Sequence, residues 1–204
     1  MLPVTADLDH ALSLADAADA ISMRWFGSRT LTIDTKPDLT PVSVADREVE
    51  EEIRSRIPKR HSFVGEESGE SGTARTRWIV DPIDGTRNFV RGIPVFATLI
   101  ALERRGEIVL GVCSAPALHR RWWAQRGEGA WLNGDPIHVS GVQRIEDAVV
   151  AYTSARDFFA KGLGDEFVDL ANRSWTARGV GDFWMHMLVA EGAAELAIDL
   201  TVSL

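Results

Sequence analysis

The sequence predicts a mixed α/β protein of the α+β type, and three features of its hydrophobic pattern support this fold class. Apolar residues recur at helical spacing over residues 7–26 and 43–57. Residues 95–124 contain apolar runs separated by tight turns, which is typical of an antiparallel meander. From residue 148 onward, short apolar runs alternate with helical patterns, which indicates an α/β arrangement.

The first part of the chain should open with a packing helix over residues 7–26 and a short strand at 31–33. A second helix is expected over residues 43–57, with Ser43 as its N-cap and Pro58 after its last residue. The other expected elements are strands at 63–64, 78–80, 95–102, 108–113 and 121–124, and a short helix that begins at 85–86.

A boundary is expected near residues 144–147, which separates an N-terminal domain (1–145) from a C-terminal α/β domain (146–204). The C-terminal domain is expected to contain strands at 148–152, 174–178 and 195–199, and helices at 157–171 and 182–191.

The composition of the 204 residues, 45% hydrophobic and 25% charged, is that of an ordinary globular protein. A net charge of −8 without a basic stripe argues against nucleic acid as a partner. No apolar run has the length needed to cross a bilayer, so we expect no membrane partner. Cys113 is the only cysteine, which excludes an internal disulfide and favours the reducing cytoplasm.

Acidic residues follow two of the predicted strands. Asp81 stands at the end of the strand at 78–80, and Pro82 bends the chain so that Asp84 returns towards Asp81. A strand that ends in Asp before a proline turn is common, and by itself it favours an ordinary turn. A second acidic segment, Gly65-Glu66-Glu67, follows the strand at 63–64, however. Three or four carboxylates at one sheet edge repel one another strongly, which favours a bound cation.

Carboxylate oxygens suit Mg²⁺, and the free amides at a helix start suit phosphate. Because Gly85-Thr86 can open a helix directly after Asp84, the sequence predicts that a metal site and a phosphate site adjoin each other.

Asp46 and Asp182 each allow two interpretations. Asp46 continues the apolar stripe of the second helix backwards, which is unusual for an acid that has no partner, but a negative charge is also favoured at a helix N-terminus. Asp182 follows Gly181 at a helix start, where it is either an N-cap or a contact for the substrate.

The segments Gly65-Glu66-Glu67 and Asp81-Pro82-Ile83-Asp84-Gly85-Thr86 resemble the motifs of the inositol monophosphatase family of Mg²⁺-dependent, lithium-sensitive phosphatases. The resemblance extends from about residue 36 to the last residue. It implies a layered α/β/α/β/α sandwich, two or three Mg²⁺ ions per site, a small phosphorylated metabolite as substrate and a homodimer. Gly181-Asp182 makes the chain most similar to the histidinol-phosphatase branch, since the inositol branch tends to have small neutral residues there.

The clustered acids and this resemblance together imply roles for individual residues. The implied metal ligands are Glu66, Asp81, Asp84 and the Ile83 carbonyl, and the implied phosphate contacts are Gly85, Thr86 and Lys36. The implied catalytic residues are Glu66, Thr86 and Asp46, and the implied substrate contacts are Asp182, Asp199 and Arg178.

One departure concerns the C-terminal end. The family places a Trp-Asp pair, whose aspartate binds the second metal, soon after the strand that ends near Asp199, but the chain stops at residues 201–204, where that pair should begin. We therefore expect a truncated chain with a weakened second metal site. The expected activity is that of a histidinol-phosphate phosphatase. The alternatives are an inositol-1-phosphate or broad sugar-phosphate phosphatase, and an impaired fragment that only binds metal or phosphate.

Overall fold

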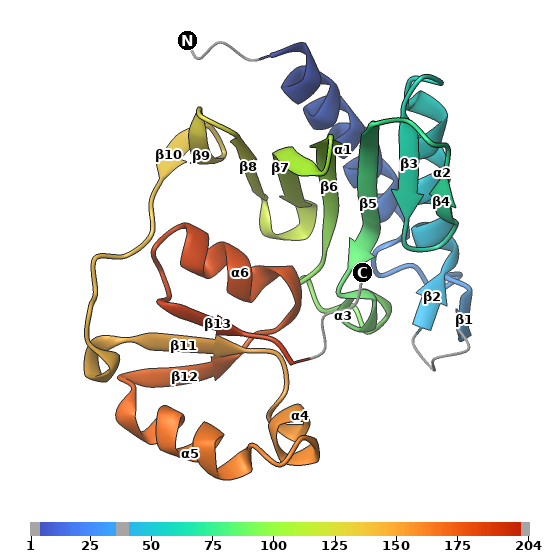
Figure 1. Cartoon of the computed structure of the whole chain (residues 1–204). Coiled ribbons are helices and arrows are strands. Elements are labelled where there is room, and N and C mark those ends of the chain that lie inside the picture. Colours follow the sequence, from blue (N-terminus) through green and yellow to red (C-terminus); the bar gives the residue numbers. More distant parts are fainter. Residues whose placement is uncertain (1–4, 36–40, 201–204) are drawn as a thin grey trace. The chain divides into compact units, whose positions relative to one another are not determined.

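The computed structural model describes residues 5–35 and 41–200. The chain divides between Gly134 and Asp135 into two compact units, whose elements are labelled in Figure 1. The boundary expected at residues 145/146 lies eleven residues after this division. The functional roles of the two domains stay a prediction.

The first unit is built on an eight-stranded sheet with the strand order β10-β9-β8-β7-β6-β5-β3-β4, of which only the edge strand β10 lies beyond the unit boundary. Strands β6, β7 and β8 pair antiparallel, as the meander predicted over residues 95–124 requires. The pairs β5–β6 and β8–β9 are also antiparallel, whereas β3 and β5 run parallel. The strands are β3 (Ser62–Gly65), β4 (Gly69–Ser71), β5 (Thr76–Asp84), β6 (Ala97–Arg104), β7 (Glu107–Ala115), β8 (Arg120–Gln125), β9 (Gly129–Leu132) and β10 (Asp135–Ile137).

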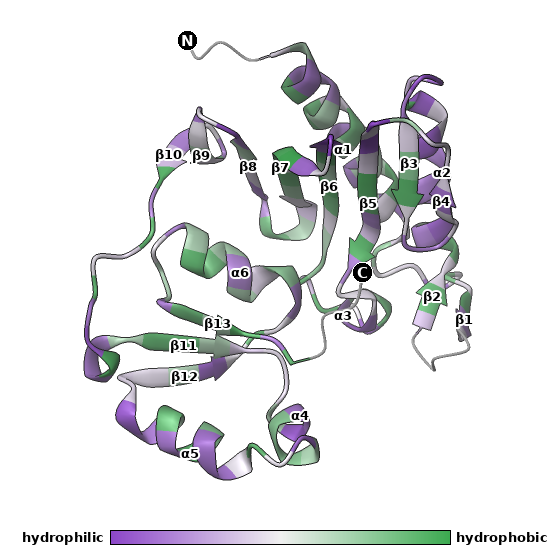
Figure 2. Cartoon of the chain, in the orientation of Figure 1, coloured by the Kyte–Doolittle hydropathy of each residue, from purple (hydrophilic) through white to green (hydrophobic). Residues whose placement is uncertain are grey.

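Two helices, α1 (Ala6–Trp25) and α2 (Val44–Arg56), cover one face of this sheet. Alternate residues of the central strands point towards them, because successive side chains of a strand face opposite sides. The result is one buried cluster, which includes Leu14, Val49, Ile53, Trp78, Val80, Ile100, Leu102, Leu110 and Val112. Figure 2 shows hydrophobic residues along β5, β6 and β7.

The first unit differs from the sequence prediction in several features, one of which is the additional strand β9. Strand β5 does not stop at Asp81 but continues to Asp84, because the pairing with β6 shifts between these residues and the resulting bulge accommodates Pro82. The strand predicted at residues 31–33 is β1 (Ile33–Thr35), which forms a hairpin with β2 (Pro41–Ser43). The connection after Glu67 contains the short strand β4. The remaining elements are the helix α3 (Thr86–Val90) and the 3₁₀ turn η1 (Pro116–Leu118).

The second unit contains a three-stranded parallel sheet with the order β12-β11-β13. The helix predicted at residues 157–171 is wrong: two helices replace it, because Gly162 takes a left-handed conformation (φ 74°) that ends the first one. The elements are η2 (Ile145–Asp147), β11 (Val149–Tyr152), α4 (Ala155–Ala160), α5 (Gly164–Arg173), β12 (Thr176–Gly179), α6 (Asp182–Ala190) and β13 (Leu196–Ile198). In Figure 2, α5 carries both hydrophilic and hydrophobic residues.

Among the described residues, no helix combines the length and the apolar character that crossing a bilayer requires.

A half-buried histidine directly before β3 must stay neutral to accept a hydrogen bond from β5. Trp78 is almost fully buried, and its indole Nε1 donates a hydrogen bond of 3.1 Å to Nδ1 of His61. Burial, followed by the positive charges of Arg60 and Arg104, lowers the pKa of His61 below its usual 6.5. The unfolded chain therefore binds a proton more readily than the folded chain, so acidification below about pH 6.5 should destabilise the fold.

We expect the free energy of unfolding of the wild type to fall more steeply between pH 6.5 and pH 5 than that of His61→Gln, which keeps an acceptor but does not titrate. Chemical denaturation at each pH, followed by tryptophan fluorescence, measures the difference. His138→Asn, at an exposed position, is the control and should retain the slope of the wild type. Equal slopes for the wild type and His61→Gln would contradict the assignment.

Candidate active site

The parallel pairing of β3 and β5 brings the two acidic segments together. Gly65, the last residue of β3, pairs with Val80, and the backbone N–H of Glu66 donates to the Val80 carbonyl at 3.2 Å. Asp81 follows Val80 directly. Glu66, directly after β3, and Asp81, inside β5, therefore lie next to each other on two hydrogen-bonded strands.

The bulge in β5 places the second aspartate. Asp81 pairs with Leu99 and Asp84 with Ala97, and the register is irregular between them. The bulge is held by Thr98 of β6, whose buried Oγ1 donates to the Pro82 carbonyl at 2.8 Å. This role of Thr98 was missed by sequence reasoning, although a threonine inside the apolar run of residues 95–102 was a signal for a buried hydrogen bond.

Burial and the charges of nearby acids act on the Asp81 carboxyl. Burial first, and then the negative charges of Asp84 and Glu66, raise the pKa of Asp81 well above its usual value, and Asp46 adds a smaller contribution. The Oδ1 atom of Asp81 is buried and has no hydrogen-bond partner among the described residues. A buried carboxylate oxygen without a donor is unfavourable, and a cation would relieve both this defect and the repulsion.

These residues fit a hard divalent cation by their chemistry. Mg²⁺ is bound in proteins by one or two carboxylates together with water and substrate oxygens. Within residues 5–35 and 41–200, no three acidic, histidine or cysteine side chains are already arranged around a common metal position. The fit therefore rests on the donor set and on the buried oxygen of Asp81.

Asp46 and Thr86 form a hydrogen-bonded pair beside these acids. Thr86 Oγ1 lies 3.0 Å from the Ile83 carbonyl and 3.3 Å from Asp46 Oδ1, so the Ile83 carbonyl faces the threonine hydroxyl. Asp46 is fully buried, and its Oδ2 accepts hydrogen bonds from Ser43 N (2.8 Å) and Ser43 Oγ (2.6 Å). Burial raises the pKa of Asp46, against the opposing effect of the hydrogen bonds from Ser43.

Both interpretations of Asp46 therefore have support. The bonds with Ser43 complete a capping box at the start of α2, which is a structural role. The second oxygen of Asp46 lies beside Thr86 in the candidate site, which agrees with its position on the buried stripe of the helix.

The chain enters α3 through Gly85. This residue is the N-cap and has φ 83°, a left-handed conformation that glycine adopts at little cost. The amides at a helix start have no partner within the helix, so Gly85 and Thr86 offer N–H groups next to Asp84. Lys36, predicted to contact phosphate, lies outside the described residues.

The three predicted substrate contacts belong to segments near the carboxyl edge of the sheet in the second unit. In a parallel sheet the carboxyl ends of all strands lie at one edge. Arg178 lies near the end of β12, Asp199 follows β13, and Asp182 opens α6. Two backbone bonds join this edge: Gly181 N to Tyr152 O at 3.2 Å and Thr153 N to Ile198 O at 3.3 Å.

Asp182 itself is not an N-cap, so that interpretation is wrong. Gly181 is the N-cap, and Asp182 is the first helical residue, with an unusual positive φ of 49°. A positive φ outside glycine costs energy, and such strain is concentrated at functional sites.

Residues 5–203 match the model of the inositol monophosphatase family. The chain belongs to this family. As one of its members it is a phosphate monoester hydrolase, which confirms the prediction of family and enzyme class.

Individual members of the inositol monophosphatase family refine this assignment. The chain is 48% identical to a histidinol-phosphatase of Streptomyces coelicolor over 97% of its own length and 79% of the relative. It is 47% identical to a histidinol-phosphatase of Mycobacterium tuberculosis, with the same two coverages, 97% and 79%. The crystal structure of the extragenic suppressor protein suhB from Bartonella henselae superposes with a TM-score of 0.88 at 32% identity, covering 97% of this chain and 80% of that one. The fold class and the similarity to the histidinol-phosphatase branch are thereby confirmed.

Proposed function

We propose that this inositol monophosphatase family member hydrolyses the phosphate ester of histidinol phosphate, with Mg²⁺ as its cofactor. The observation that carries the proposal is the buried Oδ1 atom of Asp81, which has no hydrogen-bond partner among the described residues, in a carboxyl whose pKa is raised by burial and by the charges of nearby acids. The 48% identity to a histidinol-phosphatase supports the choice of substrate.

Glu66, Asp81, Asp84 and the Ile83 carbonyl would hold the metal. When bound, Mg²⁺ supplies positive charge that offsets the clustered carboxylates and stabilises the charge on the phosphoryl group.

The chain's own residues prepare the attacking water. Thr86 Oγ1 has a single hydrogen, and when it is directed at Asp46 Oδ1 the oxygen lone pairs are free to accept a proton from water. The raised pKa of Asp46 makes this carboxylate a suitable final acceptor of that proton. Glu66, in the turn after β3, would orient the same water. The water oxygen then bonds to phosphorus, the bond from phosphorus to the ester oxygen breaks, and that oxygen takes a proton from solvent water as it leaves with the alcohol.

The remaining predicted contacts concern the phosphate group and the alcohol part of the substrate. The amides of Gly85 and Thr86 would bind phosphate oxygens, with Lys36 as a further charge. Asp182 and Asp199 would meet the ammonium or imidazole group of histidinol, and Arg178 would contact the substrate from β12. We further propose a homodimer in the cytoplasm, as the family resemblance and the single cysteine favour.

The test is a comparison of phosphate release from histidinol phosphate and from inositol 1-phosphate, with and without Mg²⁺. We expect turnover that requires Mg²⁺, is lost in EDTA and is faster with histidinol phosphate. Faster hydrolysis of inositol 1-phosphate would favour the inositol or sugar-phosphate alternative. Absence of turnover on either ester would favour a chain that only binds metal or phosphate.

A further inference from the structure

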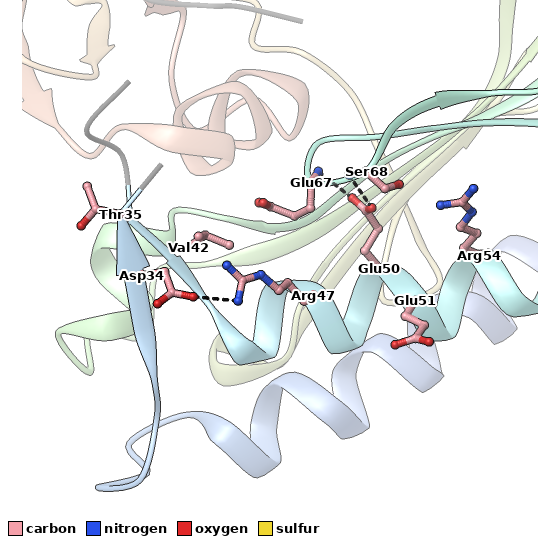
Figure 3. A pocket seen from close by; sticks show the side chains of 9 residues that line it. All are labelled: Asp34, Thr35, Val42, Arg47, Glu50, Glu51, Arg54, Glu67 and Ser68. Atoms are coloured by element: carbon pink, nitrogen blue, oxygen red, sulfur yellow. Dashed lines mark hydrogen bonds and ion pairs between the residues drawn. The ribbon is translucent and has the colours of Figure 1, made fainter. Parts of the chain in front are cut away.

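A pocket of about 690 Å³ lies between α2 and the turn that follows β3 (Figure 3). Its floor contains a buried acid that none of the roles above uses. Glu50, in the middle of α2, is 3% exposed. The pocket residues are Asp34, Thr35, Val42, Arg47, Glu50, Glu51, Arg54, Glu67 and Ser68.

The Glu50 carboxylate is bound by the backbone of the turn and not by an arginine. Its Oε2 accepts the N–H of Glu67 at 2.8 Å, and its Oε1 accepts the N–H of Ser68 at 2.9 Å. Figure 3 shows both bonds, together with Arg47 directed away from Glu50 towards Asp34, at 2.7 Å. Hydrogen bonds to an ionised acceptor are among the strong ones, and here both carboxylate oxygens take part.

Glu50 also restricts Gly65, the residue directly before Glu66. A Cβ atom added to Gly65 would lie 2.4 Å from Oε2 of Glu50, so no side chain fits at residue 65 while the carboxylate stays in place. The backbone before Glu66 thus packs against the Glu50 carboxylate, and the backbone after it donates hydrogen bonds to the same group.

We propose that Glu50 is a positioning residue that fixes the turn bearing Glu66, and thereby holds the Glu66 carboxylate beside Asp81 for the metal. This inference rests on the proposed function of Glu66 as a metal ligand. The reason is geometric: a ligand at the end of a strand is held only as firmly as the turn that follows it. Groups outside the first coordination shell that orient ligands typically change metal affinity ten- to a hundredfold when they are removed.

The sequence contained a partial signal for this role. Glu50 lies four residues after Asp46, on the same face of α2, and both side chains are buried. One helix therefore presents one acid to Thr86 and, one turn later, a second acid to the turn that bears Glu66. An acid repeated at helical spacing on an apolar stripe indicates that both acids have partners.

The test is the substitution Glu50→Gln, which keeps the shape of the side chain. Its amide nitrogen cannot accept a hydrogen bond, so one of the two backbone N–H groups would face another donor. We expect the Mg²⁺ affinity measured by calorimetry to fall at least about tenfold, and the Mg²⁺ concentration for half-maximal phosphate release to rise in proportion. Hydrogen exchange at the amides of residues 67 and 68 should accelerate in the metal-free protein.

The matched control is Glu51→Gln, which removes the same charge from the next residue of α2 in the same pocket, at an exposed position. It should retain the Mg²⁺ affinity and the exchange rates of the wild type. Gly65→Ala disturbs the same contact from the side of the turn and should weaken Mg²⁺ binding similarly. The double variant Gly65→Ala/Glu50→Gln should bind Mg²⁺ no more weakly than whichever single variant has the lower Mg²⁺ affinity.

Wild-type Mg²⁺ affinity in a folded Glu50→Gln protein would overturn the proposal. If Glu50→Gln does not fold, Gly65→Ala provides the same test, and unchanged Mg²⁺ affinity there would overturn it. A wild type that binds Mg²⁺ but hydrolyses no ester would refute the proposed function alone, because the affinity comparison would still decide the role of Glu50.

Discussion

Replacing Asp81 by asparagine should abolish Mg²⁺-dependent phosphate release and, at the same time, stabilise the metal-free protein. Both effects have one cause. Asp81 is buried next to Asp84 and Glu66, and its Oδ1 atom has no hydrogen-bond partner among the described residues. Asparagine removes one of the mutually repelling charges and offers Glu66 a donor, but it also removes the charge that a divalent cation requires.

The expected size of each effect follows from the energies involved. Loss of a metal that supplies about 4 kcal/mol of transition-state stabilisation lowers the rate about a thousandfold. Relief of about 1 kcal/mol of repulsion raises the melting temperature of a protein of this size by about 2–4 °C. The measurements are phosphate release from histidinol phosphate in saturating Mg²⁺ and calorimetric unfolding in EDTA.

Glu128→Gln is the control for Asp81→Asn, because it removes one negative charge from an exposed turn of the first unit. Glu128→Gln should alter neither the rate of phosphate release nor the melting temperature. A folded Asp81→Asn protein that retained Mg²⁺-dependent hydrolysis would contradict the proposed metal site. An unchanged or lower melting temperature would contradict the view that the acids repel one another in the absence of a cation.

The second large effect is expected at Asp182, and it concerns the choice of substrate. Asp182→Asn should lower kcat/KM for histidinol phosphate about ten- to a hundredfold, because a charged hydrogen bond to the ammonium or imidazole group contributes about 1.5–3 kcal/mol. Inositol 1-phosphate has no positive charge, so its slower hydrolysis should change by less than about twofold.

The backbone at Asp182 makes asparagine the appropriate replacement. Aspartate and asparagine are the residues other than glycine that best tolerate a positive φ, and φ at this position is 49°. Asp165→Asn, in the first turn of α5, is the control and should change neither rate. An equal loss of kcat/KM on both esters would show that Asp182 supports the fold and does not contact the charged group of histidinol phosphate.

The sequence by itself determined the fold class and the pair of acidic segments. Hydrophobic periodicity is a local property, so the helices α1 and α2 and the meander from β6 to β8 could be predicted from residue spacing alone. The acids at Glu66 and Asp81 were recognisable for a similar reason, because each directly follows a short apolar run. A motif of this kind lies within a few consecutive residues.

Only the tertiary structure decided how these acids are held. The shift in pairing between Asp81 and Asp84 depends on β6, and Thr98, which secures it, lies 16 residues from Pro82 in the chain. The bonds from the turn to Glu50 span 17 and 18 residues. Hydrogen bonds between distant residues leave no periodic pattern in the sequence, because their geometry depends on how strands and helices pack. The residue types at the site could therefore be predicted from the chain, whereas their positioning is a product of the fold.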